Sequence, residues 1–112
     1  MRLFPLAALL ALALVPLALG AAGSPSGANL KQGKIFFVAA CGGCHTLKAA
    51  GTHGTKGPNL VEEPKTFGSI VEQIAYGGGG MPALGNGLTK AQIRNIAAYV
   101  VKSTPTTGAR DD

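Results

Sequence analysis

Both cysteines of this 112-residue chain lie in one pentapeptide, Cys41-Gly42-Gly43-Cys44-His45. Two thiols at this spacing, placed at the end of a helix, can reach the two vinyl groups of one porphyrin and form thioethers with them. The residue that follows can then turn its imidazole onto the iron. The pentapeptide therefore predicts one covalent haem c per chain, attached through Cys41 and Cys44, with His45 as an iron ligand.

Three other interpretations of the pentapeptide remain open. A redox-active Cys-x-x-Cys pair belongs to folds with βαβ units, of which the sequence shows no sign. A zinc site could combine Cys41, Cys44 and His45 with His53, although such sites usually have separated ligand pairs. A structural disulfide between Cys41 and Cys44 would give no reason for the adjacent His45. We favour the haem interpretation over these three.

A haem iron with His45 on one side needs a ligand on the other, and Met81 is the one methionine besides Met1. Met81 follows a run of glycines, which can approach a porphyrin closely, and it precedes a proline that stiffens the loop. The alternatives are that Met81 fills an apolar gap, or that His53 is the ligand and gives a lower potential. His53 follows His45 closely and should stay on the same side of the ring. We therefore favour Met81 and expect His53 to be a solvated loop residue.

The first 22 residues have the composition of a secretory signal. Arg2 precedes an almost purely apolar run, Leu3 to Leu19, and small residues follow it. We predict a signal peptide over residues 1–22, with an uncleaved membrane anchor as the alternative because of the length of the run. Residues 23–28 are rich in serine, proline and glycine and predict a linker. The expected location is extracytoplasmic, in the periplasm or at the outer face of the cell membrane.

Three segments have helical periodicity, and no stretch alternates convincingly as a strand. Each begins at a polar capping residue, and glycine- and proline-rich loops separate them. The predicted helices run from Asn29 to Cys41, from Thr66 or Ser69 to Gly77, and from Thr89 to about Lys102. We therefore predict an all-α domain over residues 29–103 and a flexible tail over residues 104–112.

Four motifs along the chain match one known family. They are Gly33-x3-Phe37-x3-Cys41 leading into the pentapeptide, Gly57-Pro58-Asn59-Leu60, Met81-Pro82, and Ile96-Ala97-Ala98-Tyr99. With them the chain resembles the small bacterial class I mono-haem cytochromes c over essentially all of residues 29–103. It departs from the wider family in having no tryptophan and a short, glycine-rich segment before Met81. Both departures suit the compact bacterial members.

The resemblance implies a class I cytochrome c-like fold, with three to four helices and long loops wrapped around one covalent haem. It implies that Gly33 permits a close crossing of the first and last helices, with Phe37 packing near Ile96 and Tyr99. It further implies that the Pro58 carbonyl accepts a hydrogen bond from the non-ligating nitrogen of His45. The implied haem-binding residues are Cys41, Cys44, His45, Pro58 and Met81, of which His45 and Met81 bind the iron.

The implied function is an exported one-electron carrier between redox proteins of a respiratory or photosynthetic chain, with no catalytic residues and no enzyme activity. One alternative is a haem enzyme or gas sensor with an open iron position, against which Met81 speaks. The other is a tethered electron-entry subunit of a larger oxidase or dehydrogenase, which an uncleaved N-terminal segment would support.

The charge pattern bears on the partners. The net charge is +5, with scattered lysines and neither a basic run nor an aromatic stripe, which suits acidic protein partners and argues against nucleic acid. We expect a positive rim that attracts acidic docking surfaces of the donor and acceptor. Its candidate residues are Lys48, Lys56, Lys65 and Lys90. Membrane contact is expected only through an uncleaved N-terminal segment or a membrane-bound partner.

Overall fold

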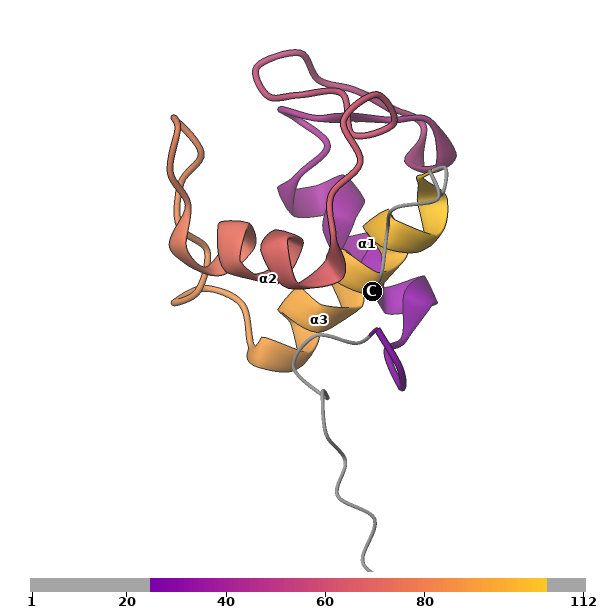
Figure 1. The fold of residues 1–112 in the computed structure, drawn as a ribbon, viewed down its shortest axis with the longest axis vertical. Coiled ribbons are helices and arrows are strands. Elements are labelled where there is room, and N and C mark those ends of the chain that lie inside the picture. Colours follow the sequence, from indigo (N-terminus) through magenta and orange to yellow (C-terminus); the bar gives the residue numbers. More distant parts are fainter. Residues whose placement is uncertain (1–24, 105–112) are drawn as a thin grey trace, which may run out of the picture.

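Three α-helices, one short strand pair and the loops between them make up residues 25–104, the part of the chain that the computed structural model describes (Figure 1). The elements in chain order are α1 (Leu30–Ala40), β1 (Thr46–Leu47), the 3-10 helix η2 (Lys48–Ala50), β2 (Thr52–His53), α2 (Phe67–Tyr76) and α3 (Lys90–Ser103). The three predicted helices are therefore confirmed, and the domain is mostly helical. The expectation of no strand is wrong at one place, because β1 and β2 form a two-residue antiparallel pair.

A side chain caps the start of each helix at a residue that the sequence predicts. Asn29, Thr66 and Thr89 each accept a hydrogen bond from the backbone N–H three residues later. The side chain of Gln92 accepts in return from the backbone N–H of Thr89 at 2.8 Å, which completes a capping box. At the other end of α2, Gly77 has a φ of 68°, which suits glycine and ends the helix as predicted.

The helices α1 and α3 cross at Gly33, where a side chain would not fit. A Cβ atom there would lie 2.7 Å from the carbonyl carbon of Asn95 and 2.9 Å from the Cβ of Tyr99. The close approach places the ring of Phe37 6.2 Å from that of Tyr99. It also lets the backbone N–H of Asn29 donate to the side-chain oxygen of Asn95 at 2.9 Å. The predicted close crossing and the packing of Phe37 are confirmed.

The apolar core lies where α1 and α2 pack on α3 (Figure 1). Its largest fully buried side chains come from all three helices and from β1, and are Phe37, Leu47, Phe67 and Ile96. The middle of α3 is buried over the whole range 96–100. A helix buried on every side at its centre acts as a fixed scaffold for the two others.

Several predicted segments lie outside the described residues. These are the signal peptide or anchor over residues 1–22, the first two residues of the linker over 23–28, and the tail over 104–112 except its first residue. Within residues 25–104, no helix has both the length and the apolar character needed to cross a membrane.

Candidate functional site

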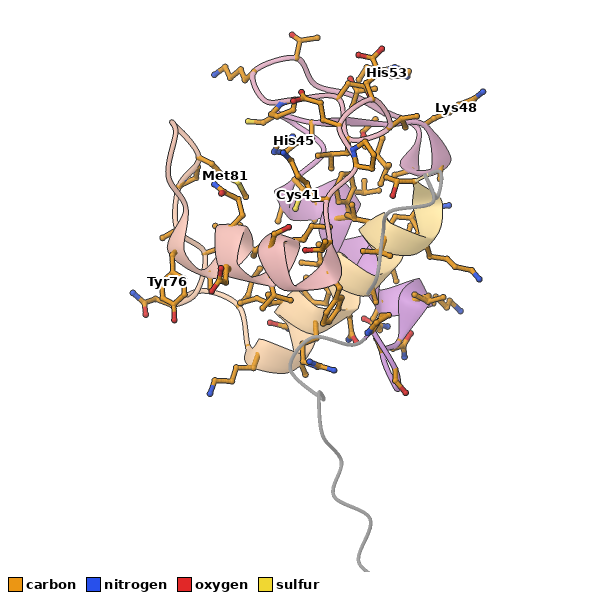
Figure 2. The ribbon with its side chains drawn as sticks, in the orientation of Figure 1. Cys41, His45, Lys48, His53, Tyr76 and Met81 are labelled. Carbon is orange, nitrogen blue, oxygen red and sulfur yellow. The ribbon has the colours of Figure 1, made fainter. Side chains whose placement is uncertain are left out.

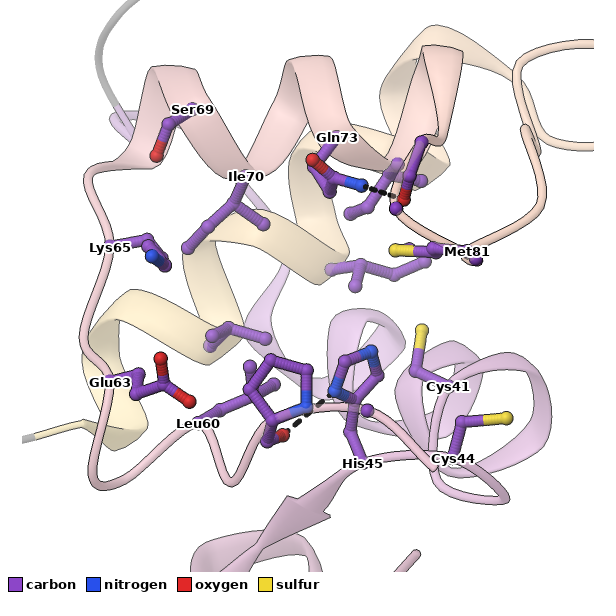
Figure 3. A pocket seen from close by; sticks show the side chains of 18 of the residues that line it. Cys41, Cys44, His45, Leu60, Glu63, Lys65, Ser69, Ile70, Gln73 and Met81 are labelled. Carbon is purple, nitrogen blue, oxygen red and sulfur yellow. Dashed lines mark hydrogen bonds between the residues drawn. The ribbon is translucent and has the colours of Figure 1, made fainter. Parts of the chain in front are cut away.

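A cavity of about 530 Å³ opens between α2, the loop after α2 and the loop that follows α1. This volume lies within the usual range for cofactor sites. Figure 3 shows Met81 on one side of it, and His45 with the two cysteines on the other. The structure thus brings together all the predicted site residues, which are Cys41, Cys44, His45, Pro58 and Met81.

The pentapeptide forms a tight turn at the end of α1. The N–H of Cys41 donates to the carbonyl of Phe37 at 2.8 Å, which continues the helical pattern by one residue. The N–H groups of Cys44 and His45 then both donate to the carbonyl of Cys41, at 3.1 and 3.0 Å. This turn places the two side chains next to each other at one end of the cavity (Figure 3). Both thiols are free, so the disulfide alternative is not realised.

The two thiols differ in environment. Cys41 is buried and Cys44 is exposed. Burial, and to a lesser degree the neighbouring Cys44, raises the pKa of the Cys41 thiol to about 11. This thiol is therefore protonated at neutral pH in the absence of a bound group. Among residues 25–104, no three His, Cys, Asp or Glu side chains are grouped so as to hold a metal ion, and the zinc alternative loses its support.

His45 is oriented by a hydrogen bond on one ring nitrogen. Its Nδ1 lies 2.9 Å from the carbonyl oxygen of Pro58, and because a carbonyl can only accept, Nδ1 carries the proton. The neutral ring then has an unprotonated Nε2, which Figure 3 shows turned toward the cavity. An imidazole held in this way is prepared to bind a metal through Nε2. The hydrogen bond that the resemblance implies is present.

Gly57 is a site residue whose role sequence reasoning missed. A Cβ atom there would lie 2.5 Å from Cε1 and 2.8 Å from Nδ1 of His45, so the ring occupies the space of the missing side chain. The N–H of Gly57 also donates to the carbonyl of Cys44 at 2.7 Å. The one feature of the sequence that could have indicated this role is the position of Gly57 directly before Pro58.

Thr52 is a second residue that sequence reasoning missed. Its buried hydroxyl donates to the carbonyl of His45 at 2.9 Å and accepts from the N–H of Leu47 at 3.0 Å. Thr52 therefore ties the backbone of His45 to the β1–β2 pair. A single threonine in a glycine-rich loop carries no local signal for this role.

Met81 is presented by a turn built from glycines. Gly78 and Met81 each donate their N–H to the carbonyl of the other, at 2.9 and 3.1 Å. All residues over the range 77–80 are glycines with φ between 63° and 123°, a region that residues with side chains rarely adopt. The side-chain amide of Gln73 donates to the Gly78 carbonyl at 3.1 Å and joins the turn to α2. The turn directs the Met81 side chain toward the cavity (Figure 3).

The polarity of the cavity fits a haem. Apolar side chains, including Phe37 and Ile74, line it. Figure 3 shows Lys65, Ser69 and Glu63 at the end away from the cysteines. A haem has vinyl groups on one half of the ring and two propionate carboxylates on the other. With the vinyl groups at the cysteines, the carboxylates belong at the polar end, where a lysine and a hydroxyl can bind them.

The structure separates the four lysines of the expected rim. Lys56 and Lys65 line the cavity, whereas Lys48 and Lys90 do not. Figure 2 shows Lys48 in η2 at the side of the molecule away from Met81. His53 is exposed on β2 and also lies outside the cavity lining, which agrees with its expected place in solvent.

Comparison with known proteins gives consistent results. The family model described as cytochrome C oxidase, cbb3-type, subunit III matches residues 28–100. A cytochrome c6 of Synechococcus sp. is 34% identical over 106 residues, covering 83% of this chain and 87% of the relative. A cytochrome c6 of Picosynechococcus sp. is 36% identical over 110 residues, covering 82% of this chain and 90% of the relative. The crystal structure of the c-type cytochrome SorU from Sinorhizobium meliloti matches with a TM-score of 0.61 and 32% identity, over 67% of this chain and 90% of SorU.

Proposed function

This chain belongs to the class I mono-haem c-type cytochromes, and from that premise we propose that it carries single electrons outside the cytoplasm, with His45 and Met81 as its axial iron ligands. Membership of the family gives a covalently bound haem c and an electron-transfer function rather than an enzymatic one. The ligands, the location and the chemistry of the partners are the parts that we propose.

The ligand proposal rests on one observation, the placement of His45 and Met81 on opposite sides of a cavity that both cysteines also line. Pro58 engages Nδ1 of His45, so Nε2 is the nitrogen left for the iron. Met81 is the one methionine among residues 25–104. Cys41 and Cys44 would hold the porphyrin by thioether bonds. When bound, the haem supplies an iron that alternates between the ferric and ferrous states.

The residues around the cavity can hold both iron ligands in place when the iron changes its oxidation state. Hydrogen bonds fix the His45 ring and the Met81 turn from separate elements, so both ligands can stay in place in either oxidation state. A methionine sulfur favours ferrous iron and gives a higher potential than a second histidine would. Apolar side chains beside the ligands exclude water, and this exclusion also raises the potential.

Optical spectra of the haem-loaded protein, oxidised and reduced, test the ligands. We expect a c-type spectrum with a far-red sulfur-to-iron band that Met81→Ala abolishes. His53→Ala is the matched control for the rival ligand and should keep the band. Loss of the band in His53→Ala with retention in Met81→Ala would refute the proposal. Rapid and complete carbon monoxide binding at neutral pH would instead favour a haem enzyme or gas sensor.

The proposed location rests on the sequence of residues 1–22, with its single arginine and long apolar run. Cell fractionation and N-terminal sequencing of the haem-loaded protein test it. A mature protein outside the cytoplasm that begins directly after residues 20–22 would support a cleaved signal. A cytoplasmic protein that starts at Met1 would contradict export.

The proposed partners are redox proteins with acidic docking surfaces. The supporting observation is that Lys56 and Lys65 lie at the cavity, where a partner must approach. Electron-transfer rates with an acidic partner should fall with rising salt and in Lys56→Ala, since exposed charges steer encounter. Lys48→Ala, which removes a lysine outside the cavity lining, is the control. Electron-transfer rates that stay the same at high salt and in Lys56→Ala would refute docking to an acidic surface.

A second candidate function follows from the description of the matched family as an oxidase subunit. In that case the chain would deliver electrons as a tethered subunit of a larger oxidase. Retention of residues 1–22 in the haem-loaded protein, together with co-purification of an oxidase in mild detergent, would favour this role. Recovery of the cytochrome alone from the soluble fraction would favour the freely diffusing carrier.

A further inference from the structure

Exposed apolar side chains concentrate on α1. Four large apolar side chains are exposed in the described part of the chain, and three belong to this one helix. They are Leu30, Ile35 and Val38, which are 40%, 51% and 47% exposed, whereas the fourth, Tyr76, lies at the end of α2. Single exposed apolar residues are ordinary on protein surfaces. Three on a helix of 11 residues form a surface that needs an explanation.

Lysines alternate with these apolar residues. Leu30, Lys34 and Val38 follow one another at intervals of four and form one row along the helix, and Lys31 and Ile35 form the adjacent row. We call these five exposed residues the α1 outer face. The sequence of α1, LKQGKIFFVAA, contains no acidic residue. The α1 outer face is therefore both apolar and positively charged.

The α1 outer face is separate from the haem site. Gly33 and Phe37 face the core, and Phe37 is the one residue of α1 that lines the cavity. In Figure 2 the labelled His45 and Met81 lie toward the upper left, and the first turns of α1 lie at the lower right. A partner on the α1 outer face would therefore leave the lining of the cavity uncovered.

We propose that the α1 outer face binds membrane surfaces that carry anionic lipid headgroups. Lysines attract such surfaces over a Debye length, and their aliphatic stems can lie along the bilayer interface while the ammonium groups stay among the headgroups. The apolar side chains between them can enter the boundary of the acyl region. Five residues make a weak contact, which suits reversible docking or support for a second attachment. The inference rests on the export that is part of the proposed function.

The chain before α1 favours a membrane over a protein as the occupant. The apolar run Leu3 to Leu19 ends ten residues before α1 begins. Ten extended residues reach at most about 35 Å. If the run stays in the bilayer, α1 begins within this distance of it, and no other element follows the run so closely. The α1 outer face then has a membrane as its nearest large surface.

Lysine footprinting of the haem-loaded, full-length protein tests the proposal. Acetylation rates are measured by mass spectrometry with vesicles of equal parts phosphatidylglycerol and phosphatidylcholine, with phosphatidylcholine vesicles, and without vesicles. Lys31 and Lys34 should react several-fold more slowly with the anionic vesicles alone, and 1 M salt should remove the effect. Lys56 and Lys90 in the same molecules are internal controls and should keep their rates, whether or not residues 1–22 are retained.

A pair of variants separates the apolar contribution from folding and from haem binding. Ile35→Ser combined with Val38→Ser should reduce the protection of Lys31 and Lys34 several-fold. Tyr76→Ser removes the exposed apolar side chain outside α1 and should leave the protection unchanged. Both proteins should keep the c-type spectrum and the potential, which report the proposed electron-carrier function independently.

Two results would overturn the membrane assignment. One is unchanged acetylation of Lys31 and Lys34 on anionic vesicles, which would leave a protein as the occupant of the α1 outer face. The other is protection confined to Lys56 and Lys65, which would place the membrane contact at the cavity instead. A third result bears on the proposed electron carrier alone. If the unmodified protein showed no c-type spectrum, the haem function would be refuted, but membrane binding by the α1 outer face would not.

Discussion

Replacing Gly33 by alanine tests how far the domain depends on the close crossing of α1 and α3. The added methyl carbon would lie 2.7 Å from the carbonyl carbon of Asn95 and 2.9 Å from the Cβ of Tyr99. Ordinary contacts of a Cβ atom begin at 3.4 Å, and the carbonyl oxygen of Asn95 lies closer still than its carbon, so the two helices must move apart by at least roughly 0.7 Å. Because the obstructing atoms of Asn95 belong to the backbone of a buried helix, no side-chain rotation can relieve the contact.

The expected loss of stability follows from two opposing effects. A gap of this size removes about a quarter to a half of the attraction between atoms in contact, and here it opens beside the Phe37–Tyr99 pair. Overpacking of this kind costs about 3 kcal/mol at the upper end of its usual range. Alanine recovers about 1 kcal/mol through its higher helix propensity. The net loss is about 2 kcal/mol, or a fall in Tm of about 8–16 °C for a domain of this size.

Gly68→Ala is the matched control, since it makes the same substitution in another helix. Gly68 lies in α2, and a Cβ atom there would have nothing within 4 Å. This variant should therefore be stabilised by up to about 1 kcal/mol. Thermal and guanidinium unfolding of the haem-loaded proteins, followed by far-UV circular dichroism, measures both changes. If Gly33→Ala were as stable as Gly68→Ala, the argument from helix crossing would be wrong.

Three more predictions concern the site. Thr52→Val keeps the shape of the side chain but removes a buried hydroxyl that bonds the backbone of His45 and Leu47. It should lower the free energy of unfolding in guanidinium by about 1–3 kcal/mol, and no change would contradict that role. Gly57→Ala should turn the His45 ring from its carbonyl partner. The imidazole then becomes a less basic ligand, and the potential in voltammetry should rise; an unchanged potential would contradict this. Cys41→Ser with Cys44→Ser prevents attachment, and far-UV circular dichroism should show a chain that has lost most of its helix, because the cavity then lacks its apolar filling; a fully helical chain would contradict this.

The helices were predictable because each begins at a residue whose side chain caps it locally. Asn29, Thr66 and Thr89 act within three residues of their own position, so the sequence alone contains the relevant partners. The β1–β2 pair was not predictable in the same way. Strands of two residues are too short to alternate, and this pair depends on the hydroxyl of Thr52.

The residues of the candidate site differ in the same way, because some are recognisable from their sequence neighbours and others only from the folded structure. Cys41, Cys44 and His45 are neighbours in sequence, and their chemistry follows from their spacing. Met81 stands out because it is the one methionine after Met1 and follows a run of glycines. Gly57 has no chemistry of its own, and its role arises from a distance to the His45 ring that exists only after folding.

Glycine, rather than aromatic packing, determines the geometry of this domain. At Gly33 it lets two helices cross, at Gly57 it makes room for the His45 ring, and over the range 77–80 it builds the turn that presents Met81. Gly33 and Gly57 permit a close approach, and the glycines over 77–80 permit positive φ angles. None of them adds a side chain to the core, which leaves a small chain with less apolar surface to bury. The covalent haem then extends the core that the three helices form, because the cavity is lined by Phe37, Ile74 and Ile96 of that core. We therefore expect the loss of the haem to lower the stability of the domain as well as to abolish electron transfer.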